Sequence, residues 1–304
     1  MRADGDAVVS TTSTRRPVRP PTTGFGEAIT KPLSILRWSL DGRSLVKIYR
    51  GLDPHGRQQR EAYALRRAAS FGLTVPEVID TGVNDSLGWN ILSVVGTGTP
   101  IRTVADVSRY VHDVIDVTAR LRFCSTNTTG LAPGVGWSGH AAAGNRHYLL
   151  AQLSLGARTR PIFDQLHDLL RTYDRTPAVH LHGDLKPEHL LHHGRQIAVI
   201  DWESCGRGPA ECDHVDAAFH LLRDLVYAGA DPRLAPVRAL GSLDAPGDLL
   251  AWRVALWLDR RRDRDLHLLT SADVRALCAA RDSAMACRLT VDLLARLHAA
   301  GVPR

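Results

Sequence analysis

The feature that most constrains the fold is a short strand-forming segment inside a long helical half of the chain. Between residues 104 and 300, apolar residues recur mostly at three- and four-residue spacing, which is typical of helices that bury one face. Residues 179–200 break this pattern, because short apolar runs alternate there with turn residues. We therefore expect a mainly helical lobe that carries its polar, chemically active residues on a small strand-and-loop segment.

The N-terminal third of the chain predicts strands. Residues 34–40 and 44–49 are apolar runs joined by an Asp-Gly turn at residues 41–42, which is the strongest hairpin signal in the sequence. A helix is expected next, over residues 58–71, where apolar side chains share one face. Residues 89–95 form a further apolar strand. This part should therefore form a small sheet with one helix.

The change of pattern predicts two lobes of unequal size and an α+β fold class. Residues 24–96 should form a small β-rich N-lobe and residues 97–304 a larger helical C-lobe, with a hinge over residues 96–100. Residues 1–23 have too little apolar content to offset ordering entropy, and we expect a flexible tail there. Helices of the C-lobe are expected over residues 104–123, 161–173, 212–228, 246–262 and 271–300.

Composition excludes several classes of protein. The chain has 304 residues, 44% of them hydrophobic and 23% charged, which is too long for a disulfide-stapled miniprotein and too apolar for a disordered chain. The five cysteines are scattered without a C-x-x-C pair, so they are interpreted as reduced thiols of a cytoplasmic protein. The net charge is +6, but both signs are interspersed, so we expect no nucleic-acid partner. No apolar run approaches the ~20 residues that span a bilayer, so no membrane association is expected.

Two carboxylates each follow a short apolar strand. Asp184 comes after residues 179–182, and Asp201 comes after residues 197–200. An acid at the end of an apolar strand is costly to bury unless it meets a cation. Phosphoryl transfer uses this arrangement, with one carboxylate at the acceptor hydroxyl and another holding Mg²⁺ against the nucleotide. The alternative interpretation is a pair of capping or turn aspartates.

The sequence around these aspartates resembles the aminoglycoside phosphotransferase and choline kinase group, which has the protein-kinase-like fold. The pattern H-G-D-x-x-x-x-N of this group is matched at His182, Gly183 and Asp184, and its metal-binding I-D-W-E is matched at residues 200–203. The resemblance implies that Asp184 is the catalytic base, that Asp201 binds Mg²⁺ and that His182 orients the catalytic loop. It also implies ATP or GTP as the phosphate donor.

The same resemblance implies roles for residues outside these two motifs. Lys47 would contact the nucleotide phosphates, and Glu61 would pair with Lys47 and hold it in place. The nucleobase would lie against backbone groups from Ser93 to Val95. Asp213 resembles a residue of the group that supports the catalytic loop, so we interpret it as supporting rather than reacting.

Two positions depart from the pattern of the group. His189 stands where an asparagine metal ligand is usual, and imidazole suits Mg²⁺ less well than an amide oxygen. Some macrolide kinases of the group also have histidine there, so His189 is kept as a metal-site residue. The nucleotide loop, residues 30–34, contains no glycine, and phosphate contacts would come from its backbone and from Thr30, Lys31 or Ser34.

Three other patterns are weighed and set aside. Residues 134–139 match G-x-G-x-x-G, but no strand precedes them, so a connection between helices is favoured over a dinucleotide site. The histidines at 180–193 lack the cysteines or helix typical of zinc sites. Residues 259–265 alternate in charge, which is typical of a solvated helix end.

The sequence leaves open what kind of molecule accepts the phosphate. Asp213, Asp216 and Asp224 fall on one predicted helix and are candidates to pair with an aminoglycoside. Trp202, Trp252 and Trp257 are candidates to line an apolar cleft instead.

Three hypotheses follow. The first is an ATP-dependent phosphotransferase that acts on a hydroxyl of a small molecule, an antibiotic or a related metabolite. The second is a kinase that phosphorylates Ser or Thr of a ribosomally made precursor peptide, ahead of elimination by a partner lyase. The third is a nucleotide-binding scaffold without activity, which His189 and the glycine-free loop would favour.

Overall fold

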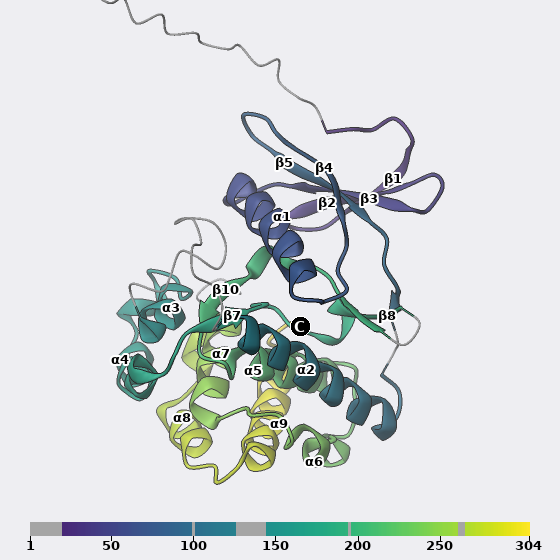
Figure 1. Cartoon of the computed structure of the whole chain (residues 1–304). Helices are drawn as coiled ribbons and strands as arrows, with labels where there is room; N and C mark the ends of the chain where they lie inside the picture. Colours follow the sequence, from purple (N-terminus) through teal and green to yellow (C-terminus); the bar gives the residue numbers. More distant parts are fainter. Residues whose placement is uncertain (1–19, 99–100, 126–143, 194–195, 261–264) are drawn as a thin grey trace, which may run out of the picture.

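A computed structural model shows a sheet-containing N-terminal part above a larger helical part (Figure 1). It describes residues 20–98, 101–125, 144–193, 196–260 and 265–304. The α+β class is therefore confirmed. Most of the predicted tail and the whole G-x-G-x-x-G segment lie outside the described residues.

The N-lobe is a five-stranded antiparallel sheet with one helix against it. The strand order is β1-β2-β3-β5-β4. The strands are β1 (Phe25–Thr30), β2 (Ser34–Ser39), β3 (Ser44–Tyr49), β4 (Val78–Val83) and β5 (Gly88–Ser93). The predicted hairpin is confirmed as β2 and β3, and Gly42 in its turn has a φ of 69°. Strand β4 is mostly exposed and was not predicted.

Helix α1 (Pro54–Ser70) carries the residues that face the C-lobe. It begins earlier than the predicted Gln58, because the Asp53 side chain accepts a hydrogen bond from the Gly56 N–H and Pro54 suits the first turn. It ends before Gly72, whose φ of 76° favours glycine. Its buried face includes Arg57 and Glu61, two charged residues that need partners.

The C-lobe contains the helices that support the loops between strands. They are α2 (Val104–Ser125), α3 (Asn145–Ala151), α4 (Pro161–Leu169), α5 (Cys212–Tyr227), α6 (Val237–Leu240), α7 (Gly247–Asp259), α8 (Ser271–Cys278) and α9 (Ser283–Ala299). Helices α5 and α7 are buried along most of their length and pack against each other. Among the described residues, no helix is long and apolar enough to cross a bilayer.

Two helix predictions were wrong in their extent. The segment predicted as one helix over residues 161–173 ends its α-helical part at Leu169 and continues as a 3-10 helix, Leu170–Arg175. The segment predicted over residues 271–300 is two helices, because the Asp282 side chain accepts the N–H of Met285 and starts α9 anew. Apolar residues recur at helical spacing both before and after Asp282, so the spacing alone does not reveal the break between the two helices.

The predicted strand segment forms two small sheets. Strand β7 (Val179–Leu181) pairs with β10 (Gly206–Gly208). Strand β8 (Leu190–His193) pairs with β9 (Gln196–Val199), and β6 (Thr97–Gly98) adds to its other edge. The loops that follow β7 and β9 carry Asp184 and Asp201, as the sequence predicts.

Candidate active site

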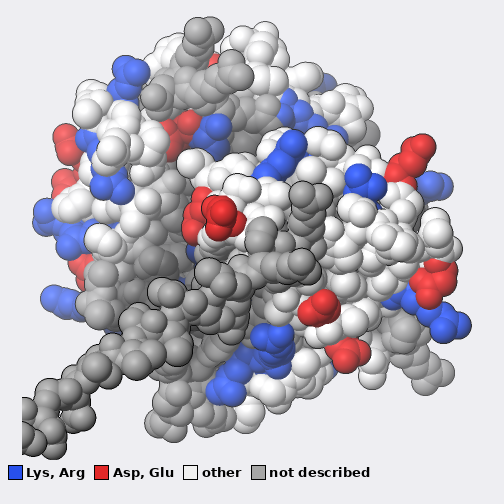
Figure 2. Space-filling model, turned by 90° about the horizontal axis from the view of Figure 1, so that it is seen from above, with Lys and Arg blue, Asp and Glu red and all other residues white. Residues whose placement is uncertain are grey.

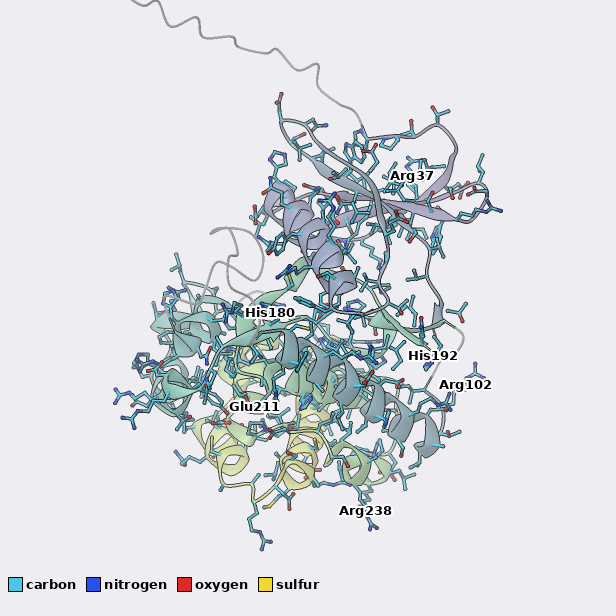
Figure 3. All side chains as sticks on the ribbon, in the orientation of Figure 1. Arg37, Arg102, His180, His192, Glu211 and Arg238 are labelled. Carbon is cyan, nitrogen blue, oxygen red and sulfur yellow. The ribbon has the colours of Figure 1, made fainter. Side chains whose placement is uncertain are left out.

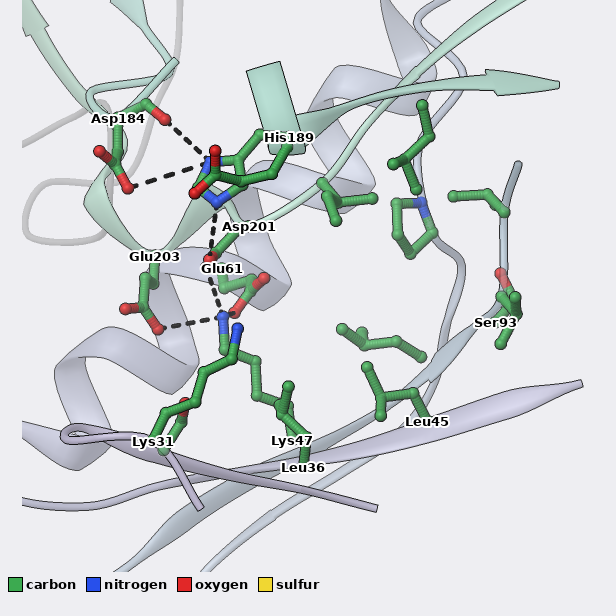
Figure 4. Close-up of a pocket in the computed structure, with 18 of the residues that line it drawn as sticks. Lys31, Leu36, Leu45, Lys47, Glu61, Ser93, Asp184, His189, Asp201 and Glu203 are labelled. Carbon is green, nitrogen blue, oxygen red and sulfur yellow. Dashed lines mark hydrogen bonds and ion pairs between the residues drawn. The ribbon is translucent and has the colours of Figure 1, made fainter. Parts of the chain in front are cut away.

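A cavity of about 460 Å³ lies between the N-lobe sheet and the small sheets of the C-lobe. One end is apolar and is lined by Leu36, Leu45, Leu92, Leu191 and Ile200. The other end is polar and is lined by Lys47, Glu61, Asp184, His189, Asp201 and Glu203 (Figure 4). The sequence-predicted acids and the lysine therefore come together at one end of one cavity.

Lys47 on β3 lies at the centre of three carboxylates. Its Nζ is 2.7 Å from Glu61 Oε2, 2.6 Å from Asp201 Oδ1 and 3.0 Å from Glu203 Oε2. Burial alone would lower the pKa of Lys47, but Asp201 and Glu61 outweigh it and hold that pKa well above its usual value. Lys47 is therefore a permanent cation, and the pairing of Lys47 with Glu61 is present in the structure.

Asp201 is held in an unusual backbone conformation. Its φ of 66° lies in the left-handed region, which residues other than glycine rarely adopt. Burial would raise the pKa of Asp201, but Lys47 and His189 outweigh it and hold that pKa well below its usual range. An ionised carboxylate on a strained turn is typical of a functional site.

Glu203 and Arg57 are site residues that the sequence reasoning missed as such. Arg57 on α1 donates to Glu203 Oε1 at 2.8 Å, and to the carbonyl oxygens of Leu33 at 2.9 Å and Arg50 at 3.1 Å. It thus links the loop of residues 30–34 to Glu203, which also contacts Lys47. Glu203 belongs to the matched I-D-W-E motif, and this motif could have identified it as a site residue.

Asp184 is flanked by two basic side chains. Its Oδ2 accepts a hydrogen bond from Lys186 Nζ at 2.9 Å, and its Oδ1 lies 3.1 Å from His220 Nε2. Burial would raise the pKa of Asp184, but His220, His189 and Lys186 together lower it far below its usual range. Asp184 is therefore ionised at neutral pH. Neither Lys186 nor His220 was singled out from the sequence.

Asp213 on α5 holds the loop that carries Asp184. The Asp213 carboxylate accepts the backbone N–H of His182 at 2.8 Å and of Gly183 at 2.9 Å. Burial raises the pKa of Asp213 to about 7, although these two donors act to lower it. The contacts agree with the predicted supporting role of Asp213.

His182 joins the loop of Asp184 to the loop of Asp201. Burial lowers the pKa of His182 to about 4, so the ring is neutral near pH 7 and its Nε2–H donates to the carbonyl of Ile200 at 2.9 Å. Gly183 reinforces the joint, since a Cβ on it would lie 2.2 Å from the Ser204 carbonyl oxygen. The two loops therefore pack backbone against backbone, and only glycine fits.

His189 lies between the two aspartates. Its Nδ1 is 2.8 Å from the Asp184 carbonyl oxygen, which can only accept, so Nδ1 carries a proton. Its Nε2 lies 3.2 Å from Asp201 Oδ2. This nitrogen is thus directed at the carboxylate that the sequence assigns to Mg²⁺.

The other residues predicted to contact the nucleotide lie at the apolar end of the cavity or in the loop of residues 30–34. Ser34, Ser93 and Val95 line the cavity, as does Lys31. The Ser93 hydroxyl accepts the Glu77 N–H at 2.8 Å, so its side chain is already engaged. Thr30 is exposed and is not among the lining residues, so its role stays a prediction.

The polar end carries oxygen donors of the kind that bind hard divalent cations. Oxygen atoms of Glu61, Asp201 and Glu203 lie within 4.8 Å of one another, and the Lys47 ammonium sits among them. Carboxylate oxygens suit Mg²⁺. By the chemistry of their donor atoms, these residues fit the metal that the motif implies.

Comparison with known proteins identifies the class. Residues 31–254 match the phosphotransferase enzyme family, so the chain belongs to that family. The resemblance stated from the motifs is therefore confirmed. No curated protein matches this chain.

Solved structures agree on the kinase-like fold. A thermostable mutant of aminoglycoside phosphotransferase APH(4)-Ia, in ternary complex with ADP and hygromycin B, has a TM-score of 0.53 and 15% identity, over 91% of this chain and 95% of that chain. Amicoumacin kinase hAmiN, in complex with AMP-PNP, Ca²⁺ and Ami, has a TM-score of 0.54 and 12% identity, over 92% of this chain and 90% of that chain. At these identities the likeness establishes the fold.

Proposed function

We propose that the protein transfers the γ-phosphate of ATP, or of GTP, to a hydroxyl group of a small molecule. One observation carries the proposal: Lys47 Nζ contacts both Glu61 and Asp201 at the polar end of a cavity that also reaches Asp184. This arrangement supports the proposal, because phosphoryl transfer would use Lys47 to bind the phosphates, Asp201 to bind the metal and Asp184 to face the acceptor. The structures of similar fold that hold ADP or AMP-PNP support the choice of donor.

The nucleotide would lie along the cavity from its apolar to its polar end. The nucleobase would occupy the space between Leu45 and Ile200, beside the backbone of Val95. The phosphates would then reach Lys47, and the loop of Lys31 to Ser34 would cover them. Arg57 holds this loop through the Leu33 carbonyl, which offers one way for a loop without glycine to keep its position.

Asp201 and Glu203 would hold Mg²⁺, with His189 Nε2 beside them. When bound, the ion would neutralise negative charge on the phosphates. Lys47 adds a second positive charge to the same phosphates and stays paired with Glu61. The chain thereby supplies the electrostatic stabilisation that phosphoryl transfer requires.

Asp184 would orient the acceptor hydroxyl. The acceptor oxygen forms a bond to the γ-phosphorus while the bond from this phosphorus to the β–γ bridging oxygen breaks, and ADP leaves. The hydroxyl proton passes to the Asp184 carboxylate. Because the pKa of Asp184 is held so low, its main contribution is orientation, with proton uptake late in the transfer.

The test is mass spectrometry of a mixed acceptor panel after incubation with Mg-ATP. The panel holds aminoglycosides, macrolides, cyclic peptide antibiotics and Ser/Thr-rich precursor peptides. We expect a gain of one phosphate on a small-molecule member, lost in Asp184→Asn and in Asp201→Asn. Asp292→Asn, an exposed residue of α9, is the matched control.

Each alternative predicts a different outcome of that experiment. Phosphorylation of a precursor peptide alone would favour the peptide kinase with a partner lyase. Nucleotide binding without transfer or hydrolysis would favour the scaffold. Transfer that persists in Asp184→Asn would refute the assignment of the catalytic residue.

A further inference from the structure

Asp184 is contacted at both of its carboxylate oxygens by basic side chains. His220 on α5 directs its ring nitrogen Nε2 at Oδ1 over 3.1 Å, and Lys186 Nζ lies 2.9 Å from Oδ2. The two contacts come from different elements, one from a helix and one from the loop of Asp184 itself. The carboxylate therefore cannot turn about its bond to Cβ without losing one of them.

Two packed helices hold His220 in place. Asp216 and His220 are four residues apart on α5, so they lie on the same face of this helix. Arg253 of α7 reaches both, because its Nε donates to Asp216 Oδ1 and its Nη2 lies 2.8 Å from His220 Nε2. The Arg253 guanidinium also lies 4.5 Å from the centre of the Phe219 ring. Asp216, His220 and Arg253 are each no more than 5% exposed, so close packing restricts their movement.

The Nε2 atom of His220 faces both a donor and an acceptor, and it can serve only one of them. With a proton it donates to Asp184, and without one it accepts from Arg253. Burial and the neighbouring Arg253 lower the pKa of His220 to about 3, so the ring carries a single proton at neutral pH.

The surroundings of the ring favour this proton on Nε2. Nδ1 is buried and has no hydrogen-bond partner among the described residues, so a proton there would leave a buried N–H unpaired. Asp184 is an anion, and a hydrogen bond to an anion is stronger than one between neutral groups. Arg253 already has Asp216 as its partner. The Nε2–H group is therefore directed at Asp184.

We propose that His220 is a positioning residue for Asp184, whose Nε2–H holds the carboxylate in the orientation that meets the acceptor hydroxyl. This inference rests on the proposed function and adds a residue to its machinery. His220 is not among the described residues that line the cavity, so it acts through Asp184. Phosphoryl transfer depends strongly on how the reacting groups are oriented, so a carboxylate held at only one oxygen should serve it less well.

NMR of the full chain labelled with 15N-histidine tests the position of the proton. Two-bond correlations between ring protons and ring nitrogens distinguish the two neutral tautomers, and the signals that disappear in His220→Gln identify this ring. At neutral pH we expect the proton on Nε2. A proton on Nδ1 would overturn the inference, because a bare Nε2 cannot donate to Asp184.

Two substitutions of His220 separate positioning from packing. His220→Leu keeps an apolar side chain but has no donor, so kcat should fall about tenfold or more while the KM for ATP changes by less than about twofold. His220→Gln has an amide that can donate to Asp184 and accept from Arg253, so its kcat should stay within about threefold of the wild type. ADP release with Mg-ATP gives both constants, with the phosphorylated member of the acceptor panel or, where none is phosphorylated, with water as the acceptor.

His192→Leu is the matched control. His192 lies on β8 (Figure 3), and its Nε2 is 3.6 Å from the carboxylate of Asp113, so it is also a histidine beside an acid but not beside Asp184. Its kcat should stay within about twofold of the wild type. Circular dichroism of each variant gives the folded fraction, to which kcat is referred.

The outcomes distinguish this inference from the proposed function. Turnover that is unchanged in His220→Leu would overturn the positioning role and leave the phosphotransferase in place. An equal loss in His220→Gln and His220→Leu would also overturn it, because the hydrogen bond to Asp184 would then not be what matters. Absence of all turnover in the wild type would refute the phosphotransferase, and the positioning role with it.

Discussion

Replacing Lys47 by methionine should unfold the protein more easily unless a divalent cation takes the place of the ammonium group. In Lys47→Met the carboxylates of Glu61, Asp201 and Glu203 are left within 4.8 Å of one another, with Lys47 gone from their centre. Removing one partner of a buried ion pair costs about 3–5 kcal/mol. Asp201 and Glu203 keep 27% and 20% of their side-chain surface exposed, so we expect the lower end, about 3 kcal/mol.

Thermal unfolding followed by circular dichroism measures the effect. A loss of about 3 kcal/mol corresponds to roughly 6–12 °C in Tm for a chain of this size. With EDTA present, Lys47→Met should show this full drop. With excess MgCl₂ the variant should recover more Tm than the wild type gains, because the cation fills the charge cluster.

The matched control is Lys31→Met, which removes a lysine that lines the same cavity. Its Tm should stay within about 2 °C of the wild type, as for most surface substitutions. The reasoning is refuted if Lys47→Met is as stable as the wild type in EDTA. It is also refuted if Mg²⁺ stabilises both proteins equally.

Three further predictions concern the loops. Arg57→Ala should raise the KM for ATP about tenfold with a smaller change in kcat, because the Leu33 carbonyl and Glu203 lose their shared donor; steady-state kinetics check this. His189→Asn should preserve or raise phosphotransfer, measured by ADP release, and complete loss would show that the imidazole has its own role. The pKa of His182 is lowered to about 4 in the fold, so the unfolded chain binds more protons between pH 6.5 and 4, and stability falls as pH falls through this window. Urea unfolding at pH 5 and at pH 7.5 should show a smaller difference for His182→Gln than for the wild type.

The elements set by local chemistry were predictable from the sequence. The Asp-Gly turn fixes the β2–β3 hairpin, and this hairpin places Lys47 on β3 beside the helix of Glu61. The motifs of Asp184 and Asp201 are contiguous in sequence, so their loops could be identified before the structure was known.

The contacts that complete the site were not predictable, because they join residues far apart in the chain. Arg57 meets Glu203 across 146 positions, and His220 meets Asp184 from a different element. Both residues look like ordinary members of amphipathic helices in the sequence. The same limit applied to Asp216, whose partner Arg253 lies on α7, so its carboxylate looked available for a ligand.

The distribution of surface charge agrees with the interspersed signs of the sequence. From above, Lys and Arg are interspersed with Asp and Glu on the visible described surface (Figure 2), so the positive net charge is not gathered on that face.

The pairing of β6 with β8 has a consequence for building hybrid enzymes. Thr97 and Gly98 of β6 are hydrogen-bonded to β8, so β6 already belongs to the C-lobe. Gly96, with a φ of 57°, packs against the His192 carbonyl, where a Cβ would lie 2.7 Å away. A chimaera that exchanges N-lobes between members of this family should therefore be joined at residues 94–96, and the incoming lobe should carry counterparts of Arg57 and Arg60, which hold Glu203 across the junction.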